Sequence, residues 1–445
     1  MPRSFHKAWV IAINMGYGHE RAAFGLKELA YGDVIIANDY PGIPTHDREL
    51  WKQSRSIYEF FSRLQPLPMV GQSLFDVMDH FQKIPDFYPR RDLSKPSLQI
   101  LETYRWIEKQ QLGKDLIARL SRRNGHLPLV STFFLPAFAA EVHKYPGDIY
   151  CVVCDTDISR AWAPLEPKRS RIRYLAPNGR VVERLKLYGV PKEQIFLTGF
   201  PLPPALIGGT AAKTVKQDLT KRLYQLDPQG IFRNKYGEIL LRELGSNSKH
   251  GSKRPLTLTF CIGGAGAQKQ LGVDVMESLR QSILQKKIHL NLEAGTRKPI
   301  ADYFIEGAKS LGLRKTLGKT LCVYSHPSRS EYFSQFTQRL RKTDILWTKP
   351  SELSFYAGAG LPIIMAPPIG SQEDFNRLWL QSVGAGVDQL DPRYTNEWLF
   401  DWIHSGGLAR FAWNGYIEAP THGTYRIQSI VTGQSTSLEN LPLIV

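Results

Sequence analysis

The segment from Trp347 to Gly386 constrains the fold more than any other part of this sequence. It predicts a short strand, a turn, a helix of small residues, a buried strand at 361–366, a loop rich in Pro and Gly, and a helix that begins at Ser371. This order places polar side chains and helix N-terminal amides at the carboxyl ends of parallel strands, where open α/β sheets bind anionic ligands. The segment therefore indicates an α/β fold with a site for a nucleotide diphosphate.

The glycines, proline and polar residues of this segment resemble the donor-sugar signature of GT-B glycosyltransferases of the monogalactosyldiacylglycerol-synthase and MurG type. That signature reads approximately G-L-P-x-I-x-x-x-P-x-x-G-Q-E-x-x-N-x-x-x-L-x-x-x-G-A-G. The matching residues are Gly360, Pro362, Gly370, Gln372, Glu373, Asn376, Leu380, Gly384 and Gly386. The resemblance implies a GT-B fold, in which two Rossmann-like doubly wound domains face each other across a cleft. It places the acceptor on the first domain and the nucleotide sugar on the second.

Length and composition agree with two soluble domains. The chain has 445 residues, which exceeds one ordinary core, and its 42% hydrophobic and 22% charged residues are typical of globular proteins. The longest N-terminal apolar run, at 8–15, is shorter than the roughly 18 to 20 residues that a membrane-spanning helix needs. We therefore expect a cytoplasmic protein, either free or peripheral on the inner face of the membrane.

The net charge of +16 is the unusual feature of the composition. A basic protein suits nucleic acid, an anionic membrane surface or an acidic acceptor, and scattered Lys and Arg can also serve solubility alone. The sequence has no zinc-ligand spacing, RNP sequence or helix-turn-helix pattern, so no specific nucleic acid is expected. The expected partners are a nucleotide-sugar donor and an anionic membrane surface or lipid acceptor.

The pattern along the chain predicts four regions. Residues 1–200 form an acceptor-binding Rossmann-like domain, 201–254 a hinge and basic insertion, and 255–395 a nucleotide-sugar-binding Rossmann-like domain. Residues 396–445 form a C-terminal helix and tail that cross back to the first domain. Strands are expected at 7–14, 33–38, 129–131, 148–154, 173–176, 194–198, 256–262, 289–292, 320–324, 344–348 and 361–366, and long helices at 49–64, 71–81, 97–122 and 398–413.

Two further groups of residues invite a membrane interpretation. The insertion has basic residues that predict a membrane-facing patch, namely Lys213, Lys216, Lys221, Arg222, Arg233, Lys235, Lys249, Lys253 and Arg254. Four aromatic residues, Trp51, Tyr58, Phe60 and Phe61, lie where the related synthases contact the acceptor, and they could meet acyl chains. A helix that packs its apolar face on the core explains these aromatics equally well.

The four cysteines are expected to be inert. Cys151 and Cys154 have the spacing of a redox motif, but they lie within the strand expected at 148–154. Positions three apart on a strand point to opposite faces, and a buried Cys behaves as a small hydrophobic side chain. We predict core thiols.

The loop Gly16-Tyr17-Gly18-His19 invites comparison with a dinucleotide-binding fingerprint. Arg21 occupies the position of the third glycine, where a large side chain would obstruct the packing of helix on strand. The loop resembles instead the G-x-G-H-x-x-A-A loop of the glycolipid synthases. That resemblance places Gly16 and Gly18 on the acceptor side and His19 beside the reacting centre, although a purely structural His19 is an alternative.

A second candidate lies at Asp155-Thr-Asp157, which follows an apolar strand. Two carboxylates one residue apart can chelate Mg²⁺ or Mn²⁺, as the D-x-D pattern of GT-A enzymes does. The surrounding order resembles instead the acceptor segments of the glycolipid synthases, which implies that Asp155 is the candidate base and that no metal is needed. Arg160 stands where those enzymes often have a His, and Thr132 ends a strand on the same face.

The donor side is expected to hold the diphosphate and the sugar. Backbone amides at Gly263, Gly264 and Gly266 allow close approach of phosphate, although a tight turn alone also explains these glycines. Hydrogen bonds to sugar hydroxyls are assigned to Gln372 and Glu373, and Asn376 is expected to brace the loop; helix capping is the alternative. The full predicted donor set is Gly263, Gly264, Gly266, Ser351, Glu352, Gly370, Gln372, Glu373 and Asn376.

One departure from the family concerns the ribose. The related enzymes have an acid five residues before the Gly of Gly-Leu-Pro, and this chain has Phe355 there. The nearest acid is Glu352, and Lys349-Pro350-Ser351 replaces the family's glycines. Either Glu352 reaches the ribose from a shifted position or ribose recognition differs.

Together these features predict an inverting glycosyltransferase without a cofactor or obligatory metal. It would move a hexose or N-acetylhexosamine from a nucleotide-diphosphate sugar, a UDP-sugar above all, to a hydroxyl of a lipid or membrane-associated acceptor. His19 or Asp155 would take the hydroxyl proton. The alternatives are a UDP-sugar 2-epimerase-like enzyme and a non-catalytic protein that binds a nucleotide sugar or lipid.

Overall fold

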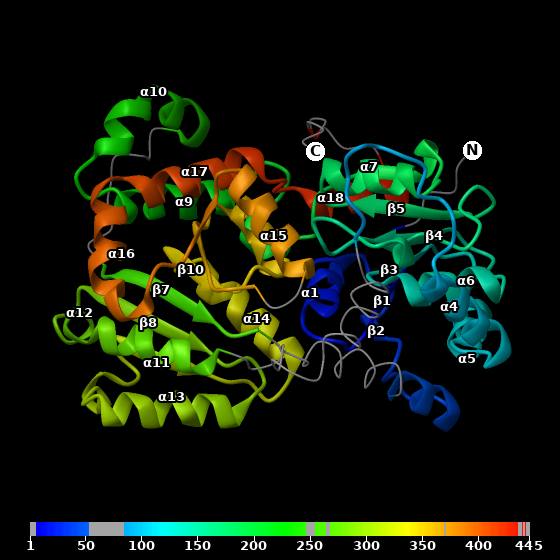
Figure 1. The fold of residues 1–445 in the computed structure, drawn as a ribbon, viewed down its shortest axis with the longest axis horizontal. Helices are drawn as coiled ribbons and strands as arrows, with labels where there is room; N and C mark the ends of the chain where they lie inside the picture. The colour runs from blue at the N-terminus through cyan, green and yellow to red at the C-terminus, as the bar shows by residue number, and fades with distance from the viewer. Residues whose placement is uncertain are drawn as a thin grey trace. The chain divides into compact units, whose positions relative to one another are not determined.

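The computed structural model describes residues 6–52, 84–245, 254–263, 268–368, 371–434, 438 and 441. The chain forms two compact units, each built on its own sheet (Figure 1). The first unit comprises Met1–Pro201, Ile369–Phe375 and His422–Val445, and the second comprises Leu202–Pro368 and Asn376–Thr421.

The first unit contains a six-stranded parallel sheet with the order β2-β1-β3-β4-β5-β6. Its strands are β1 Trp9–Ala12, β2 Ile35–Ile36, β3 Leu129–Ser131, β4 Ile149–Val152, β5 Ile172–Ala176 and β6 Ile195–Leu197. From β1 the chain adds β2 on one side and then β3 to β6 on the other, so the topological switch point lies between β1 and β3.

Both faces of the first sheet are buried, which explains its almost wholly apolar strands. Along β1, Trp9 and Ile11 pack into one core cluster, whereas Val10 and Ala12 pack into the other. This alternation follows from the period of two of a strand. The helices of this unit are α1 Gly18–Gly25, α4 Leu98–Lys109, α5 Lys114–Asn124, α6 Phe134–Val142, α7 Gly179–Leu187 and α18 Gly423–Thr432, with 3-10 helices η1 Lys27–Leu29, η2 Arg160–Trp162 and η3 Lys192–Gln194.

The second unit contains another six-stranded parallel sheet, with the order β12-β11-β10-β7-β8-β9. Its strands are β7 Leu256–Cys261, β8 Ile288–Glu293, β9 Leu321–Tyr324, β10 Ile345–Thr348, β11 Ile363–Met365 and β12 Gly386–Asp388. Numbered from its own first strand and read from the β9 edge, this sheet has the Rossmann order 3-2-1-4-5-6. Its switch point therefore lies between β7 and β10.

Helices cover both faces of the second sheet, with α11 and α13 on one face and α9 and α17 on the other (Figure 1). The helices are α8 Pro204–Ile207, α9 Lys213–Leu226, α10 Ile231–Leu244, α11 Lys269–Ser278, α12 Arg280–Leu284, α13 Lys298–Ser310, α14 Arg329–Leu340, α15 Ser371–Ser382, α16 Thr395–His404 and α17 Gly407–Glu418. The 3-10 helices are η5 Arg314–Thr316, η6 Glu352–Ala359 and η7 Pro392–Tyr394. The predicted fold class, an α/β protein with two Rossmann-like doubly wound domains, is confirmed.

Two helices that were predicted to be continuous are each divided into two. The helix expected at 97–122 is two helices, α4 and α5, because Gln111 and Gly113 between them have left-handed φ values of +54° and +78°. The helix expected at 398–413 is likewise α16 and α17, separated at Gly406 with φ +69°. The last helix, α18, belongs to the first unit, where Ile427 and Val431 pack in its core.

The predicted basic patch is partly wrong. The segment 202–245 forms helices of the second unit, and three of the cations predicted for the patch serve the fold. Arg222 is buried and donates to the backbone carbonyls of Thr343 and Gly360, while burial lowers its pKa to about 10. Arg233 and Arg254 pair with the buried carboxylates Asp227 and Asp344. Lys213, Lys221 and Lys235 are exposed, Lys216 is half-buried, and Lys249 and Lys253 lie outside the described residues.

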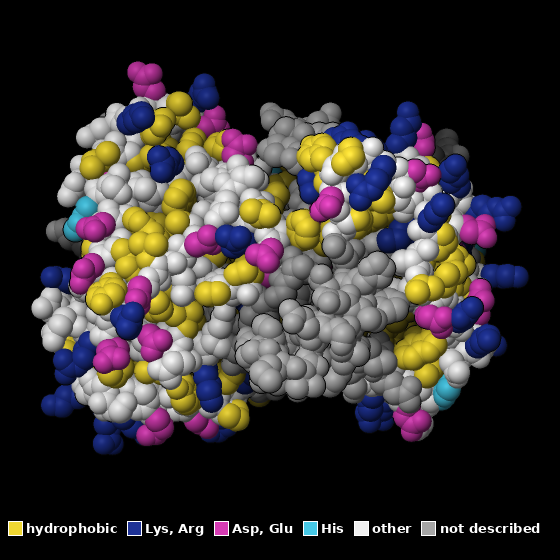
Figure 2. Space-filling model, in the orientation of Figure 1, with side chains coloured by type: hydrophobic (Ala, Val, Ile, Leu, Met, Phe, Trp, Pro, Cys, Tyr) yellow, Lys and Arg dark blue, Asp and Glu magenta, His cyan; other side chains and the backbone are white. Residues whose placement is uncertain are grey.

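On the face drawn in Figure 2, Lys and Arg side chains of the second unit are interspersed with Asp and Glu rather than gathered in one patch. The acyl-chain interpretation of Trp51 is wrong, because its side chain is 4% exposed and packs in the first core cluster. Residues 45–52 are helical, whereas Tyr58, Phe60, Phe61 and the helix expected at 71–81 lie outside the described residues. Within the described part of the chain, no helix combines the length and apolar character needed to cross a membrane.

All four cysteines are buried thiols, as predicted. Burial raises the pKa of the Cys151 thiol, so this side chain stays protonated.

Candidate functional site

The loop after β1 carries the first candidate residues to the switch point of the first sheet. Gly16 is exposed and has φ +99°, a conformation that side chains other than glycine rarely adopt. Gly18 is half-buried and begins α1, and His19 follows in the first turn of that helix. Arg21 is buried in α1, where a dinucleotide-binding loop would need a glycine.

His19 is held against the end of β3 by two hydrogen bonds. Its Nδ1 lies 2.8 Å from the carbonyl oxygen of Thr132, and the Thr132 hydroxyl donates to the His19 carbonyl over 2.8 Å. Because a carbonyl oxygen can only accept, Nδ1 carries the hydrogen in this contact. The neutral imidazole therefore has a lone pair on Nε2, which can accept a proton.

The predicted acceptor-side residues gather at one edge of this sheet. Thr132 follows β3 directly and is fully buried, and its carbonyl oxygen also accepts from the Cys154 thiol over 3.4 Å. Asp155, the residue after Cys154, is half-buried and follows β4. Since β1, β3 and β4 are consecutive in the sheet, His19, Thr132 and Asp155 all lie at the carboxyl ends of its central strands. The rings of Phe133 and Trp162 lie 4.8 and 6.2 Å from that of His19, centroid to centroid.

The alternative of a metal bound by both carboxylates of Asp155-Thr-Asp157 is not supported. Asp157 is buried, and its two oxygens accept from Nε and Nη2 of the buried Arg184 over 2.8 and 2.9 Å. Arg180 adds a third bond to Asp157 over 2.9 Å and lies 3.7 Å above the ring of Phe87. Among the described residues, no group of three or more His, Cys, Asp and Glu is placed to hold a metal ion.

Arg160 has a structural role instead of the predicted acceptor-side role. Its side chain is buried and donates to the carbonyl oxygens of Ser94, Ala163 and Pro164 over 2.9, 2.7 and 2.9 Å. Burial lowers the pKa of the guanidinium, and the ring of carbonyls satisfies its donors. The side chain joins η2 to the extended segment before α4.

The second switch point carries the loop that follows β10. Asn376 in α15 is 1% exposed, and its side-chain amide donates to the Pro350 carbonyl over 3.4 Å. Asn376 therefore contacts the loop that follows β10. Gly263, at the end of β7, lies on the other side of the same switch point. Gly264, Gly266 and Gly370 lie outside the described residues.

The predicted ribose region is organised by η6. Ser351 accepts from the Leu353 amide over 3.4 Å and caps this helix, a role that the sequence did not predict for it. Glu352 is the first residue of η6 and is half-buried. Phe355 is 2% exposed and packs on Trp379 with ring centroids 5.1 Å apart, so the family's ribose position is core in this chain. Glu352 remains the candidate acid.

The first residues of α15, up to Phe375, belong to the first unit, and the rest of the helix belongs to the second. Gln372 and Glu373 are half-buried and belong to the first unit, whereas Asn376 belongs to the second. The Gln372 amide donates to the Asp157 carbonyl of the first unit over 2.7 Å. The predicted donor residues are thus not all carried by the second unit.

A cluster that the sequence did not predict lies at the ends of β8 and β9. Glu293, the last residue of β8, is fully buried and accepts from Nε and Nη2 of Arg339. The same Nη2 lies 2.7 Å from Nε2 of His326, which must accept because Arg only donates. Burial and the charge of Arg339 lower the pKa of His326. A Glu that ends an apolar strand was the available signal.

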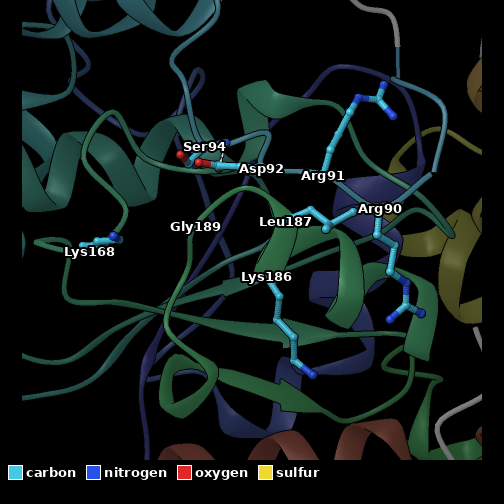
Figure 3. Close-up of a pocket in the computed structure, with 8 residues that line it drawn as sticks. All are labelled: Arg90, Arg91, Asp92, Ser94, Lys168, Lys186, Leu187 and Gly189. Carbon is cyan, nitrogen blue, oxygen red and sulfur yellow. Dashed lines mark hydrogen bonds between the residues drawn. The ribbon is translucent and has the colours of Figure 1, made fainter. Parts of the chain in front are cut away.

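A cavity of about 430 Å³ lies elsewhere in the first unit, between 90–94, 168 and the end of α7. Four of its lining residues are basic: Arg90, Arg91, Lys168 and Lys186. Figure 3 shows that Arg91 points away from Arg90 and Lys186, so the cations do not converge on one point. Because α7 starts beyond the carboxyl end of β5 and runs back along the sheet, its last residues lie away from the switch point.

The fold and these side chains define a two-unit Rossmann-like protein with polar side chains at the switch point of each sheet. No family model matches the chain, and no curated protein matches it. Among solved structures, MurG of Acinetobacter baumannii is 12% identical over 96% of this chain and 99% of its own, with a TM-score of 0.46. UDP-GlcNAc 2-epimerase of Neisseria meningitidis, bound to UDP-GlcNAc, is 12% identical over 96% and 99%, with a TM-score of 0.48. S. aureus MnaA, solved with UDP, is 13% identical over 98% and 100%, with a TM-score of 0.47.

Proposed function

We propose that this chain is a glycosyltransferase that uses a nucleotide-diphosphate sugar, above all a UDP-sugar. The second unit binds the nucleotide, and the first unit binds the hydroxyl that is glycosylated. The observation that carries the proposal is the hydrogen bond that holds the His19 ring at the first switch point, with Nδ1 2.8 Å from the Thr132 carbonyl oxygen. A positioned imidazole of this kind can deprotonate an attacking hydroxyl.

The transfer proceeds with inversion at the anomeric carbon. The acceptor oxygen forms a bond to that carbon from the face opposite the diphosphate, and His19 or Asp155 takes the proton. The electron pair of the broken bond stays on the departing β-phosphate oxygen. A lipid or membrane-associated acceptor is supported by the net charge of +16 and by the exposed Lys213, Lys221 and Lys235.

The decisive experiment measures products rather than binding. The protein is incubated with UDP-hexoses and UDP-N-acetylhexosamines, each with and without a mixture of membrane lipids, and products are separated by chromatography and mass spectrometry. Release of UDP together with a glycosylated lipid, only when lipid is present, supports the proposal. An epimerised UDP-sugar formed without acceptor contradicts it and identifies an epimerase; nucleotide binding without any product identifies a binding protein.

A second test examines the sugar site with a matched pair of variants. Glu373 and Glu397 both lie in the first turn of a helix, α15 and α16 respectively. Glu373→Ala is expected to reduce the thermal stabilisation given by the preferred UDP-sugar but to retain most of that given by UDP, whereas Glu397→Ala changes neither. Equal stabilisation of Glu373→Ala and the unmodified protein by the UDP-sugar removes Glu373 from the sugar site.

A further inference from the structure

The loop after β10 carries a cation at the switch point of the second sheet. In that sheet β7 and β10 are adjacent and parallel, with Thr348 paired to Cys261 at their ends. Lys349 is the next residue after β10, and Gly263 lies two residues beyond β7. Open parallel sheets bind their ligands outside the carboxyl ends of the strands that flank such a point. Lys349 therefore stands where the topology favours a ligand.

The side chain of Lys349 lies directly on Gly263. A Cβ built on Gly263 would lie 2.2 Å from Cε of Lys349, 2.8 Å from Cδ and 3.3 Å from Nζ. Any larger residue at 263 would displace this stem, so the glycine makes room for the lysine. From the sequence, Gly263 is expected to contact phosphate through its backbone, and no role is predicted for Lys349.

This packing holds the position of the ammonium group. Lys349 is half-buried, and the loop that it begins is fixed by the bond from Asn376 to the Pro350 carbonyl. A lysine whose stem is already packed loses less side-chain freedom when it binds an anion than a lysine extended into solvent does.

Two buried hydroxyls flank the same loop. Thr348 precedes Lys349, and Ser354 lies in η6; their side chains are 1% and 0% exposed. Within the described residues, neither hydroxyl oxygen has a hydrogen-bond partner. Buried polar groups in folded proteins are nearly all paired, and the exceptions call for a reason such as a functional site. These two hydroxyls are a second indication, independent of Lys349, of a binding site at the carboxyl end of β10.

We propose that Lys349 binds the diphosphate of the nucleotide and stabilises the charge that develops on the β-phosphate as it leaves. This assignment rests on the proposed function. The leaving oxygen gains the electron pair of the broken glycosidic bond, so its negative charge rises during the step. A fixed ammonium group beside it stabilises the transition state more than the ground state. Lys349-Pro350-Ser351 stands where the enzymes that this chain resembles have glycines, so a side chain carries more of this role.

The experiment compares ligands that differ only in phosphate. Calorimetry measures the affinity of uridine, UMP, UDP and ADP for the unmodified protein, for Lys349→Met and for Lys349→Arg. Lys349→Met is expected to weaken UDP binding by about 10- to 100-fold and to leave uridine binding unchanged, since a hydrogen bond to a charged group is lost. Lys349→Arg is expected to recover most of the UDP affinity. Lys342→Met, which removes an exposed lysine of the same unit, serves as the matched control.

The contact with Gly263 gives a second, independent readout. Gly263→Ala is expected to weaken UDP binding in the unmodified protein, because its Cβ displaces the lysine stem. The same substitution is expected to have little further effect in a Lys349→Ala background, where no stem remains. Two mutations in contact show such non-additivity, whereas independent ones add.

Each outcome has a defined meaning. Unchanged UDP affinity in Lys349→Met, or an equal loss for uridine and UDP, overturns the role of Lys349 while the proposed function stands. Tight binding of ADP but not UDP by the unmodified protein, with loss in Lys349→Met, supports Lys349 and overturns the UDP-sugar assignment. Absence of binding to every nucleoside diphosphate by the unmodified protein overturns both.

Discussion

At the scale of single residues, the hydrogen bond between His19 and Thr132 gives the clearest prediction. His19→Asn is expected to keep the bond to the Thr132 carbonyl, because the Asn side-chain nitrogen takes the place of Nδ1, but it has no group at Nε2. The rate of glycosyl transfer should fall by about 10²- to 10⁴-fold, the usual contribution of a general base. Affinity for the UDP-sugar and the thermal midpoint should stay the same.

His46→Asn is the matched control for this prediction. His46 is exposed and makes a comparable contact, from Nε2 to the Gln110 carbonyl over 3.1 Å. It should leave the rate unchanged. Full activity of His19→Asn would assign the base to Asp155 and leave His19 a structural role.

Substitution of the two carboxylates of Asp155-Thr-Asp157 should have very different effects on the free energy of unfolding. Asp157→Asn removes the charge that compensates Arg184, whose side chain is fully buried, so the free energy of unfolding should fall by roughly 3–5 kcal/mol. Asp155→Asn, at a half-buried position, should cost less than about 1 kcal/mol and act on the transfer rate instead. Urea denaturation measures both. A stable Asp157→Asn protein that loses an Mg²⁺-dependent activity would restore the metal interpretation.

At the scale of elements, α9 contains two adjacent cations with opposite roles. Arg222→Met leaves buried carbonyls of Leu340, Thr343, Ala359 and Gly360 without their donor, so the free energy of unfolding should fall by about 2–4 kcal/mol. The exposed Lys221→Met should change it by less than about 0.5 kcal/mol. If this helix faces an anionic membrane, only Lys221→Met should weaken binding to phosphatidylserine vesicles in a flotation assay. A larger loss of stability for Lys221→Met would contradict the assigned burial.

The sheets could be predicted from the sequence because parallel strands are short, continuous apolar runs between helical patterns. The strand at 129–131 is predicted to the residue, and the ends of the other predicted strands differ by at most two residues. The strand β12, Gly386–Asp388, is too short and too polar to give such a signal. Helix breaks at Gly113 and Gly406 need left-handed φ values, which a glycine permits but does not require.

The positions of candidate residues could be predicted only where they follow from the order of strands and helices along the chain. His19 and Asn376 fall in this class, because a helix start after a strand fixes where they lie. Arg160 and Arg222 do not, because whether an Arg is exposed or surrounded by carbonyls depends on segments distant in sequence, Ser94 and Thr343 among them. The contact between Lys349 and Gly263 joins two strands far apart in sequence, so periodicity could not reveal it.

At the scale of the whole molecule, acid should destabilise the protein through two histidines. Burial lowers the pKa of both His289 and His326 below the ordinary value of 6.5, and Arg339 lowers that of His326 further. The unfolded chain then binds more protons than the folded one between the lowered pKa and 6.5. The free energy of unfolding should be highest above about pH 7 and fall as the pH decreases through this window.

Two substitutions test whether His326 is a source of the acid sensitivity. His326→Gln, whose amide oxygen can still accept from Arg339, should make the free energy of unfolding less dependent on pH between about 5 and 7. Glu331→Gln removes a carboxylate 4.0 Å from His326 and should deepen the loss, since that charge favours the protonated ring. Urea denaturation across this pH range measures both effects. The same slope in all three proteins would exclude His326 as a source.

Nucleotide binding should slow hydrogen exchange mainly in the second unit, because each unit has its own sheet, core and switch point. At a UDP concentration of 100 times Kd, the binding-competent state gains about 2.7 kcal/mol, which slows the opening of the backbone around the site. Hydrogen exchange on the whole chain, read by mass spectrometry, should show the strongest protection in peptides that cover 258–263 and 345–356. Lys349→Met at the same UDP concentration should reduce that protection, while Lys342→Met should not. Protection confined to peptides at 9–19 and 129–133 would place the nucleotide at the first switch point and reverse the roles of the two units.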